Sequence, residues 1–177
     1  MRNFKIKKNF SYIVVAALVL VLFVSCKSKV APEDPESQDF SVPTATGDNA
    51  TDLTDGFYEG SLNRESYVVK GISDADAQKE IPATEKLTLE IRGNKIINGI
   101  LFGEITEAQI KKSGSEYSAS GETSNAFGAN MKEYIKFTVS EDKQTITVIE
   151  YIVVGTQDEK SFKGTYAGTL TNQTTVY

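Results

Sequence analysis

Hydrophobic and polar residues alternate along much of the chain after residue 55, which is the spacing of β-strands that have one buried face. Leu87, Leu89 and Ile91 alternate with threonine and glutamate. The sequence Arg-Gly-Asn-Lys at 92–95 is typical of a tight turn, and 96–102 has the pattern of a return strand. The pattern predicts a β-hairpin.

A second hairpin is predicted further along the chain. The apolar residues Ile135, Phe137 and Val139 alternate with polar or aromatic neighbours in the segment 133–139. A polar stretch, Ser-Glu-Asp-Lys, then leads into a strand at 144–154. Weaker strand patterns lie at 66–70 and 116–121, whereas 103–115 fits a continuing strand, a short extra hairpin or a helical turn.

Two segments at opposite ends of the predicted domain match each other. Gly56–Leu62 and Gly164–Leu170 both have the sequence G-x-Y-x-G-[ST]-L, with Tyr and Leu on one face and the second glycine between them. Glycine weakens a strand, so its repeated use indicates sharp coiling or the close approach of another backbone. Two such strands side by side would close a sheet on itself. The alternative is an accidental match, because glycine-tyrosine strands are common.

One short helix is predicted at 74–80, as a lid or connector at one mouth of a barrel. Ser73 has the chemistry of an N-cap, with Asp76 three positions later completing a capping box. Pro82 ends the helix, because it disfavours helical geometry at the residue before it. No calcium site is expected in this acidic segment, because the spacing and the Asp-Gly turn of an EF-hand are missing.

Together these patterns predict an all-β domain of about eight antiparallel strands in a small closed or partly open barrel, with a two-sheet sandwich as the alternative. The expected inner residues are bulky, so a filled interior is predicted. The arrangement is loosely similar to lipocalin-like barrels, which begin with a G-x-W strand. The corresponding residues here are Gly56-Phe57-Tyr58, and no ligand site follows from this likeness.

Glu150 interrupts the alternation in the strand 144–154. It shares its parity with Val148 and Ile152, whereas Ile149 and Tyr151 have the other parity. Either Glu150 points into the apolar interior, where it could orient the polar end of a ligand, or a bulge near Ile149 shifts the alternation and turns Glu150 toward water.

The N-terminus has the composition of an export signal. Four basic residues in the first eight are followed by an apolar run from Tyr12 to Val24, then by Ser25 and by Cys26, which is the chain's single cysteine. Thirteen apolar residues are fewer than the roughly 18 needed to span a bilayer as a helix. The segment 1–25 is therefore predicted to be removed as a signal peptide.

Phe23-Val24-Ser25-Cys26 resembles the lipobox of bacterial lipoproteins. In that family a signal peptidase recognises the three residues before the cysteine, and the thiol receives a diacylglyceryl group, with fatty acids such as palmitate. The resemblance implies that Cys26 becomes the first residue and holds the protein on the membrane. Lys27 stands where Asp is associated with retention at an inner membrane, which favours an outer membrane in a cell that has one.

The segment 26–54 is predicted to be a flexible tether, because it holds three of the four prolines, many acidic residues and few large apolar ones. The folded domain is expected at 55–177. The whole chain has a net charge of −5, and the predicted leader holds four of the 19 basic and none of the 24 acidic residues, which leaves 15 − 24 = −9. Nucleic acid is therefore not an expected partner.

Histidine is absent from the whole chain, which removes the usual general base and the commonest transition-metal ligand. The sequence also has no glycine-rich phosphate loop. No catalytic residue, cofactor or metal is therefore expected. The main hypothesis is an anchored, non-enzymatic lipoprotein of the cell envelope with a binding or envelope-interaction β domain, whose candidate partners are a protein or a small hydrophobic ligand. The alternatives are a carrier of a small hydrophobic ligand in the barrel and an exported hydrolase that uses paired carboxylates.

Overall fold

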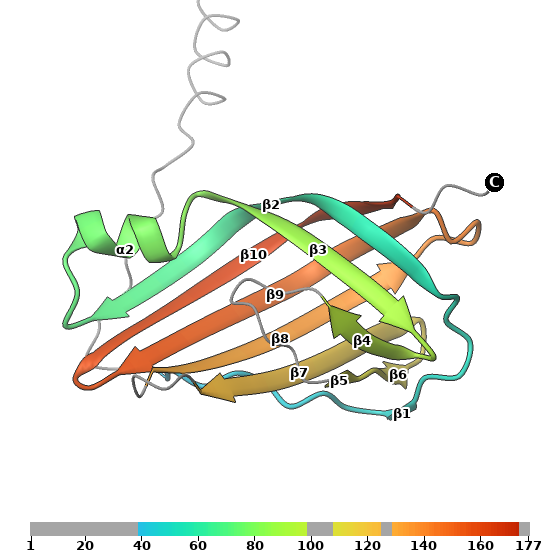
Figure 1. Ribbon diagram of the computed structural model, residues 1–177, viewed down its shortest axis with the longest axis horizontal. Coiled ribbons are helices and arrows are strands. Elements are labelled where there is room, and N and C mark those ends of the chain that lie inside the picture. The colour runs from blue at the N-terminus through green and yellow to red at the C-terminus, as the bar shows by residue number, and fades with distance from the viewer. Residues whose placement is uncertain (1–38, 99–107, 125–128, 174–177) are drawn as a thin grey trace, which may run out of the picture. The chain divides into compact units, whose positions relative to one another are not determined.

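The computed structural model describes residues 39–98, 108–124 and 129–173, all of which belong to the compact unit Pro32–Tyr177. Strands and one short helix make up most of the described chain (Figure 1). In chain order the elements are β1 (Asp48–Asn49), β2 (Gly56–Lys70), α2 (Asp74–Glu80), β3 (Thr84–Arg92), β4 (Lys95–Asn98), β5 (Ala108–Gln109), β6 (Lys111–Ser113), β7 (Glu116–Ser124), β8 (Asn130–Val139), β9 (Thr145–Gln157) and β10 (Lys160–Asn172).

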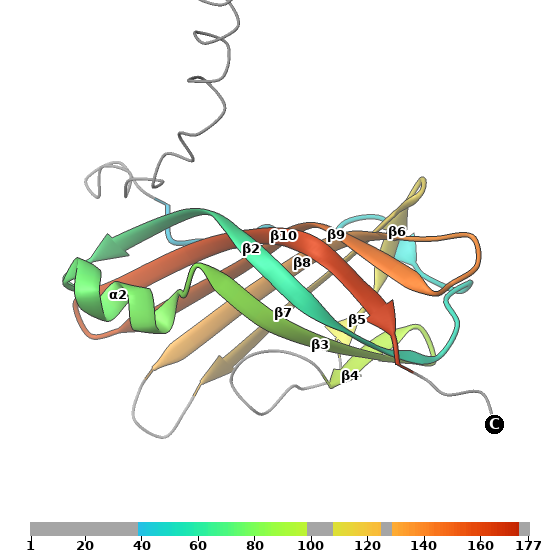
Figure 2. The ribbon, with the colours of Figure 1, turned by 90° about the horizontal axis from the view of Figure 1, so that it is seen from above.

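The ten strands form one antiparallel sheet in the order β1-β6-β7-β8-β9-β10-β2-β3-β4-β5. The sheet curls until its two edges approach each other, so that it forms a nearly closed barrel (Figure 2). The predicted all-β barrel is therefore confirmed. The structure has ten strands instead of about eight, because the short pieces β1, β5 and β6 carry too few residues to show an alternating pattern.

Both predicted hairpins are present. The β3–β4 turn contains Gly93 and Asn94, which both have positive φ, at 56° and 61°, as the type I′ hairpin turn requires. The β8–β9 hairpin pairs Val139 with Ile146 beside its turn. Residues 99–102 of the predicted return strand lie outside the described part of the chain, and so do residues 103–107 of the segment for which three alternatives were open.

Residues 108–113 connect the two edges of the sheet at one end of the barrel. Ala108 pairs with Ile96 of β4, and a few residues later Lys111 pairs with Ser118 of β7. At the other end, 84–89 of β3 pairs with β2, and 119–124 of β7 pairs with β8. Between these two stretches the described residues supply no further strand, so among them the two edges of the sheet are joined at one end of the barrel.

The two matching glycine-tyrosine segments lie in neighbouring strands, β2 and β10. Their tyrosines and leucines all point inward and are at most 2% exposed. A Cβ on Gly60 would collide with the carbonyl oxygen of Thr169, and one on Gly168 would lie 2.9 Å from the carbonyl oxygen of Ser61. The backbones of the two strands therefore approach each other closely where each carries its second glycine, as the sequence predicted.

The repeated segments also share a side-chain contact. A Cβ on Gly56 would lie 2.8 Å from the ring of Tyr58, and one on Gly164 would lie 2.8 Å from the ring of Tyr166. Each tyrosine therefore packs over the glycine two residues before it. The hydroxyl of Tyr58 donates to Lys143 O at 3.1 Å, and that of Tyr166 donates to Pro82 O at 3.1 Å.

The barrel interior is filled mainly by large apolar and aromatic side chains. The inward residues of the strands form one core cluster, to which α2 adds Ala77 and the residue after the helix adds Ile81. The helix is the predicted one, and Ser73 Oγ accepts the amide proton of Asp76 at 3.2 Å as its N-cap. The largest fully buried side chains are Tyr58, Tyr151, Tyr166 and Phe137.

The described part of the predicted tether, residues 39–54, packs against the barrel. Phe40 and Val42 pack on a small cluster of Tyr134, Ile152 and Val154 on the outer face of β8 and β9. Strand β1 then pairs with β6. The sequence predicted a flexible coil here, because isolated apolar residues cannot form a core of their own. They instead cover an apolar patch on the outside of the sheet.

Residues 50–55 cross the end of the barrel that carries the two hairpin turns. Leu53 N donates to Asn94 Oδ1 at 2.9 Å, and Lys143 Nζ donates to Thr54 Oγ1 at 2.7 Å. Asp55 Oδ1 accepts the amide proton of Gly93 at 2.8 Å. These bonds tie the N-terminal segment to both turns, so the folded domain begins well before residue 55.

Replacement of Gly60 by alanine is expected to destabilise the domain by about 2 kcal/mol, because the new methyl group forces β2 and β10 apart. Gly121→Ala is the matched control, because a Cβ there meets no atom within 4 Å. The free energies of unfolding from urea titration check the pair. Equal stability of the two variants would contradict the close approach of the two backbones.

Replacement of Phe40 by alanine is expected to lower the free energy of unfolding by about 1 to 2 kcal/mol, because the ring packs on the cluster of Tyr134, Ile152 and Val154. Thr44→Ala, at an exposed position of the same segment, is expected to change it little. Urea titration of both variants is the measurement. A Phe40→Ala variant as stable as Thr44→Ala would mean that the segment is not held on the sheet.

Candidate functional site

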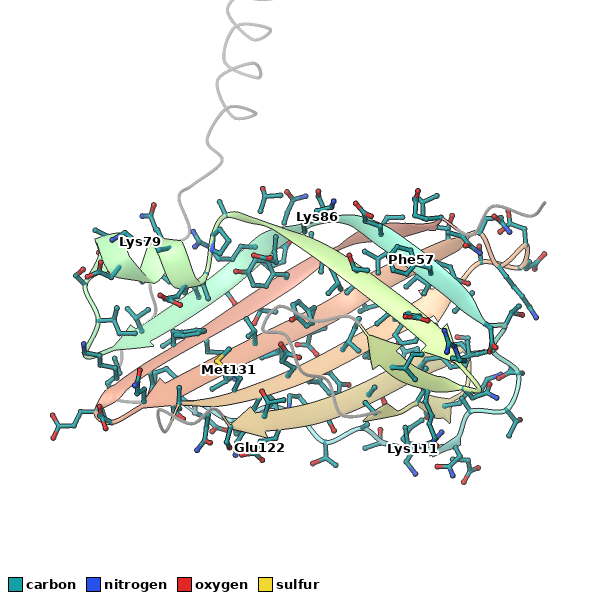
Figure 3. All side chains as sticks on the ribbon, in the orientation of Figure 1. Phe57, Lys79, Lys86, Lys111, Glu122 and Met131 are labelled. Carbon is teal, nitrogen blue, oxygen red and sulfur yellow. The ribbon has the colours of Figure 1, made fainter. Side chains whose placement is uncertain are left out.

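Glu133 of β8 points into the barrel. It lies between Met131 and Ile135 in the inward series of the strand, and both of these belong to or pack against the main core cluster. Figure 3 shows Met131 inside the barrel and Glu122 pointing away from it. In the sheet, Glu133 is opposite Gly121 of β7 and Val153 of β9. A carboxyl group is therefore placed among apolar residues.

A small cavity adjoins this carboxyl group. It is about 20 Å³ in volume, which is enough room for one water-sized group. A Cβ built on Gly121 meets no atom within 4 Å, so the missing side chain of this glycine contributes to the space. Besides Glu133 and Gly121, the cavity is lined by five apolar residues and four that carry a polar group, which are Ile96, Ala108, Ala119, Met131 and Ile135, and Ser120, Glu122, Thr123 and Tyr134.

Tyr151 supplies a hydrogen bond to the carboxyl group. Its hydroxyl donates to Glu133 Oε1 at 3.3 Å, and the residue is fully buried. Burial raises the pKa of Glu133 to about 7, and the bond from Tyr151 opposes that shift. The pKa of Tyr151 is raised well above its ordinary value by burial first and by the charge of Glu133 next. Tyr151 is therefore a neutral hydrogen-bond donor at every physiological pH.

A second carboxyl group, that of Glu85, is on the inward face of β3, two positions before Leu87. Partial burial raises the pKa of Glu85, and its charge also raises the pKa values of Tyr151 and Tyr166. The polar groups inside this half of the barrel thus act on one another. Both carboxyl groups raise the pKa of the Tyr151 hydroxyl, which links them.

Glu150 does not face this interior. Lys136 pairs with Glu150 and Phe137 pairs with Val148, so Ile149 is an extra residue in β9. The structure therefore contains the bulge that was one of the two alternatives. Ile149 is 43% exposed, and Glu150 follows the outer face of the barrel. The alternative in which Glu150 points inward and orients a ligand is wrong, because the bulge turns it outward.

The carboxyl group beside the cavity is that of Glu133, which the sequence pattern did not single out. The signal was present, since Glu133 has the same parity as Ile135, Phe137 and Val139. The inward position of Glu133 was missed because the strand was predicted to begin at this residue, and a charged residue is common at the end of a strand. The strand in fact begins at Asn130, so the alternation continues through Glu133 to Met131.

The predicted lipidation residue Cys26 and the recognition residues Phe23, Val24 and Ser25 lie outside the described part of the chain. Within the described ranges, no group of three or more acidic residues or cysteines is placed to hold a metal ion. No helix in those same ranges is long and apolar enough to cross a membrane. Comparison with protein-family models, curated proteins and solved structures finds no match to this chain.

Replacement of Glu133 by glutamine is expected to remove a pH dependence of stability. The folded pKa of about 7 exceeds the ordinary value of 4.5, so between these values the folded state retains a proton that the unfolded state has lost. Stability therefore falls as pH rises through this window, by about 3 kcal/mol in total. Below about pH 4 and above about pH 8, the contribution of Glu133 to stability no longer changes with pH.

Unfolding free energies measured at several values between pH 4 and pH 8 check this prediction. In Glu133→Gln, the free energy of unfolding is expected to fall much less as pH rises than it does in the native protein. The variant should therefore become more stable relative to the native protein as pH rises. Glu150→Gln, on the outer face of the next strand, is the control and should keep the native profile. Identical slopes for the native protein and Glu133→Gln would show that the carboxyl group is not desolvated.

Proposed function

We propose that the protein is an exported, membrane-anchored lipoprotein whose β domain binds a partner in the cell envelope without catalysing a reaction. Its membrane contact is the lipid on Cys26, and its place is the cell envelope with the domain outside the cytoplasm. The sequence Phe23-Val24-Ser25-Cys26 after a short apolar run supports the anchor. The lack of histidine in the whole chain supports a binding role over catalysis.

The structural observation that supports this proposal best is the attachment of the N-terminal segment to the barrel wall. Phe40 and Val42 pack on the outer face, and Lys163 Nζ donates to Asp39 O at 3.1 Å. Only residues 27–38 then separate this contact from Cys26. The described chain therefore begins on one defined side of the barrel, the outer face of β8 and β9, as suits a protein that is anchored through its N-terminal part.

The filled interior favours recognition on the outer surface. The fully buried rings of Tyr58, Tyr151, Tyr166 and Phe137 occupy the space that a ligand would need. Large hydrophobic side chains on the described outside include Phe57 and Ile149, which are 37% and 43% exposed. Apolar groups of this kind are suited to contact with a protein partner.

Transport of a small hydrophobic ligand is the second candidate, and the cavity beside Glu133 is the observation in its favour. Its volume of about 20 Å³ is far below the several hundred Å³ typical of sites for drug-sized ligands. A carboxyl group in its wall also disfavours a purely apolar ligand. The cavity thus suits a small polar group better than an acyl chain.

Replacement of Cys26 by serine is expected to abolish lipid attachment, because a hydroxyl cannot take the place of the thiol that accepts the diacylglyceryl group. The producing cells are grown with a labelled fatty acid, and the mass of the purified protein is measured. The native chain is expected to begin at Cys26, carry the label and remain with the membranes. Ser28→Ala is the control and should be labelled normally. An unlabelled native protein, or one that retains residues 1–25, would contradict the anchor.

A further inference from the structure

The carboxyl group of Glu133 has acceptor capacity that its one described bond does not use. An ionised carboxylate has about four acceptor positions, and the Tyr151 hydroxyl occupies one of them. The two lysines of β8 point outward, where Lys132 pairs with Glu122 at 3.6 Å and Lys136 pairs with Glu116 at 2.7 Å. Within the described ranges, no ion pair includes Glu133.

An ionised carboxylate among apolar side chains is costly unless a positive group pairs with it. Among residues 39–98, 108–124 and 129–173, the neighbours of Glu133 inside the barrel do not supply one. Gly121 faces it from β7 and Val153 faces it from β9. Tyr151 contributes a neutral hydroxyl, and the second inward acid, Glu85, adds negative charge. A cation bound next to Glu133 would therefore stabilise its ionised carboxylate.

The adjoining space limits the size of that cation. A volume of about 20 Å³ admits a group about as large as one water molecule, which is also the size of an ammonium group. The space beside Gly121 is directly opposite the carboxyl group across the β7–β8 pair. Because the ammonium group takes up this space, the attached alkyl group has to lie at the mouth of the cavity, next to apolar lining residues such as Ala119, Met131 and Ile135.

We propose that the cavity between Glu133 and Gly121 binds the ammonium group of a small primary amine. The carboxylate of Glu133 pairs with the ammonium group and accepts its hydrogen bonds, while Tyr151 holds the carboxylate in place from the opposite side. The site lies at the end of the barrel where the described parts of β3 and β7 are not joined by a strand. It is independent of lipid attachment, so it goes beyond the proposed anchoring role.

Methylammonium is the probe, added at pH 8 to the native protein purified from its producing cells, whether or not it carries lipid, with amide resonances followed by NMR. The expected result is a saturable shift at residues 119–123 and 131–135. Glu133→Gln is expected to weaken binding at least about tenfold, because the charged hydrogen-bond acceptor is lost. Tetramethylammonium has no N–H donor and is too large for the cavity, so it should neither bind there nor compete.

Two further variants separate the site from general charge effects. Gly121→Val places a side chain in the cavity without changing Glu133, and it is expected to abolish the methylammonium shifts while the protein stays folded. Glu150→Gln removes a nearby acidic residue from the outer face and is expected to bind like the native protein. The proposal is overturned if methylammonium produces no saturable shift, or if its affinity is the same in Glu133→Gln as in the native protein.

Discussion

The pairing of β2 with β10 is the contact on which the barrel depends, because it joins the first long strand of the domain to the last. The contact is close because Gly60 and Gly168 leave no side chain between the backbones. Tyr58 and Tyr166 project from this seam into the interior, and each bonds to a backbone carbonyl of another element. One repeated sequence thus brings the strands together, fills the space they enclose and ties them to Lys143 and Pro82.

Glu133 is unusual because its carboxyl group lies in an interior that these rings and other apolar side chains fill. Most inward positions of the described strands carry apolar or aromatic side chains, and the space left beside Glu133 is about 20 Å³. A carboxyl group there costs stability at neutral pH, whereas a leucine or methionine would not. Groups with strongly shifted pKa values cluster at functional sites. The raised pKa of Glu133, about 7, therefore directs attention to this part of the barrel.

Much of the fold could be read from the sequence because its signals are local. The alternation at 87–91 and 133–139, the Gly93-Asn94 turn and the Ser73 cap each depend on residues close together in the chain. The bulge near Ile149 was one of two readings of a broken alternation, and choosing between them required the register of β8 against β9.

The parts that the sequence did not reveal depend on contacts between distant residues. Phe40 and Val42 read as isolated apolar residues, because the patch they cover is formed by two other strands. A hint was present in the run Tyr151–Val154, since a strand that is apolar at every position has both faces covered. The cavity likewise arises only when Gly121 and Glu133 are brought opposite each other.

The central claim is that Glu133 holds its carboxyl group inside the barrel, largely removed from bulk water and bonded to Tyr151. The most direct test is the chemical shift of its side-chain carboxyl carbon, followed by NMR through a pH titration of the native protein. The structure predicts a midpoint of about 7. A midpoint near the ordinary value of 4.5 would contradict it, because the carboxyl group would then be fully hydrated.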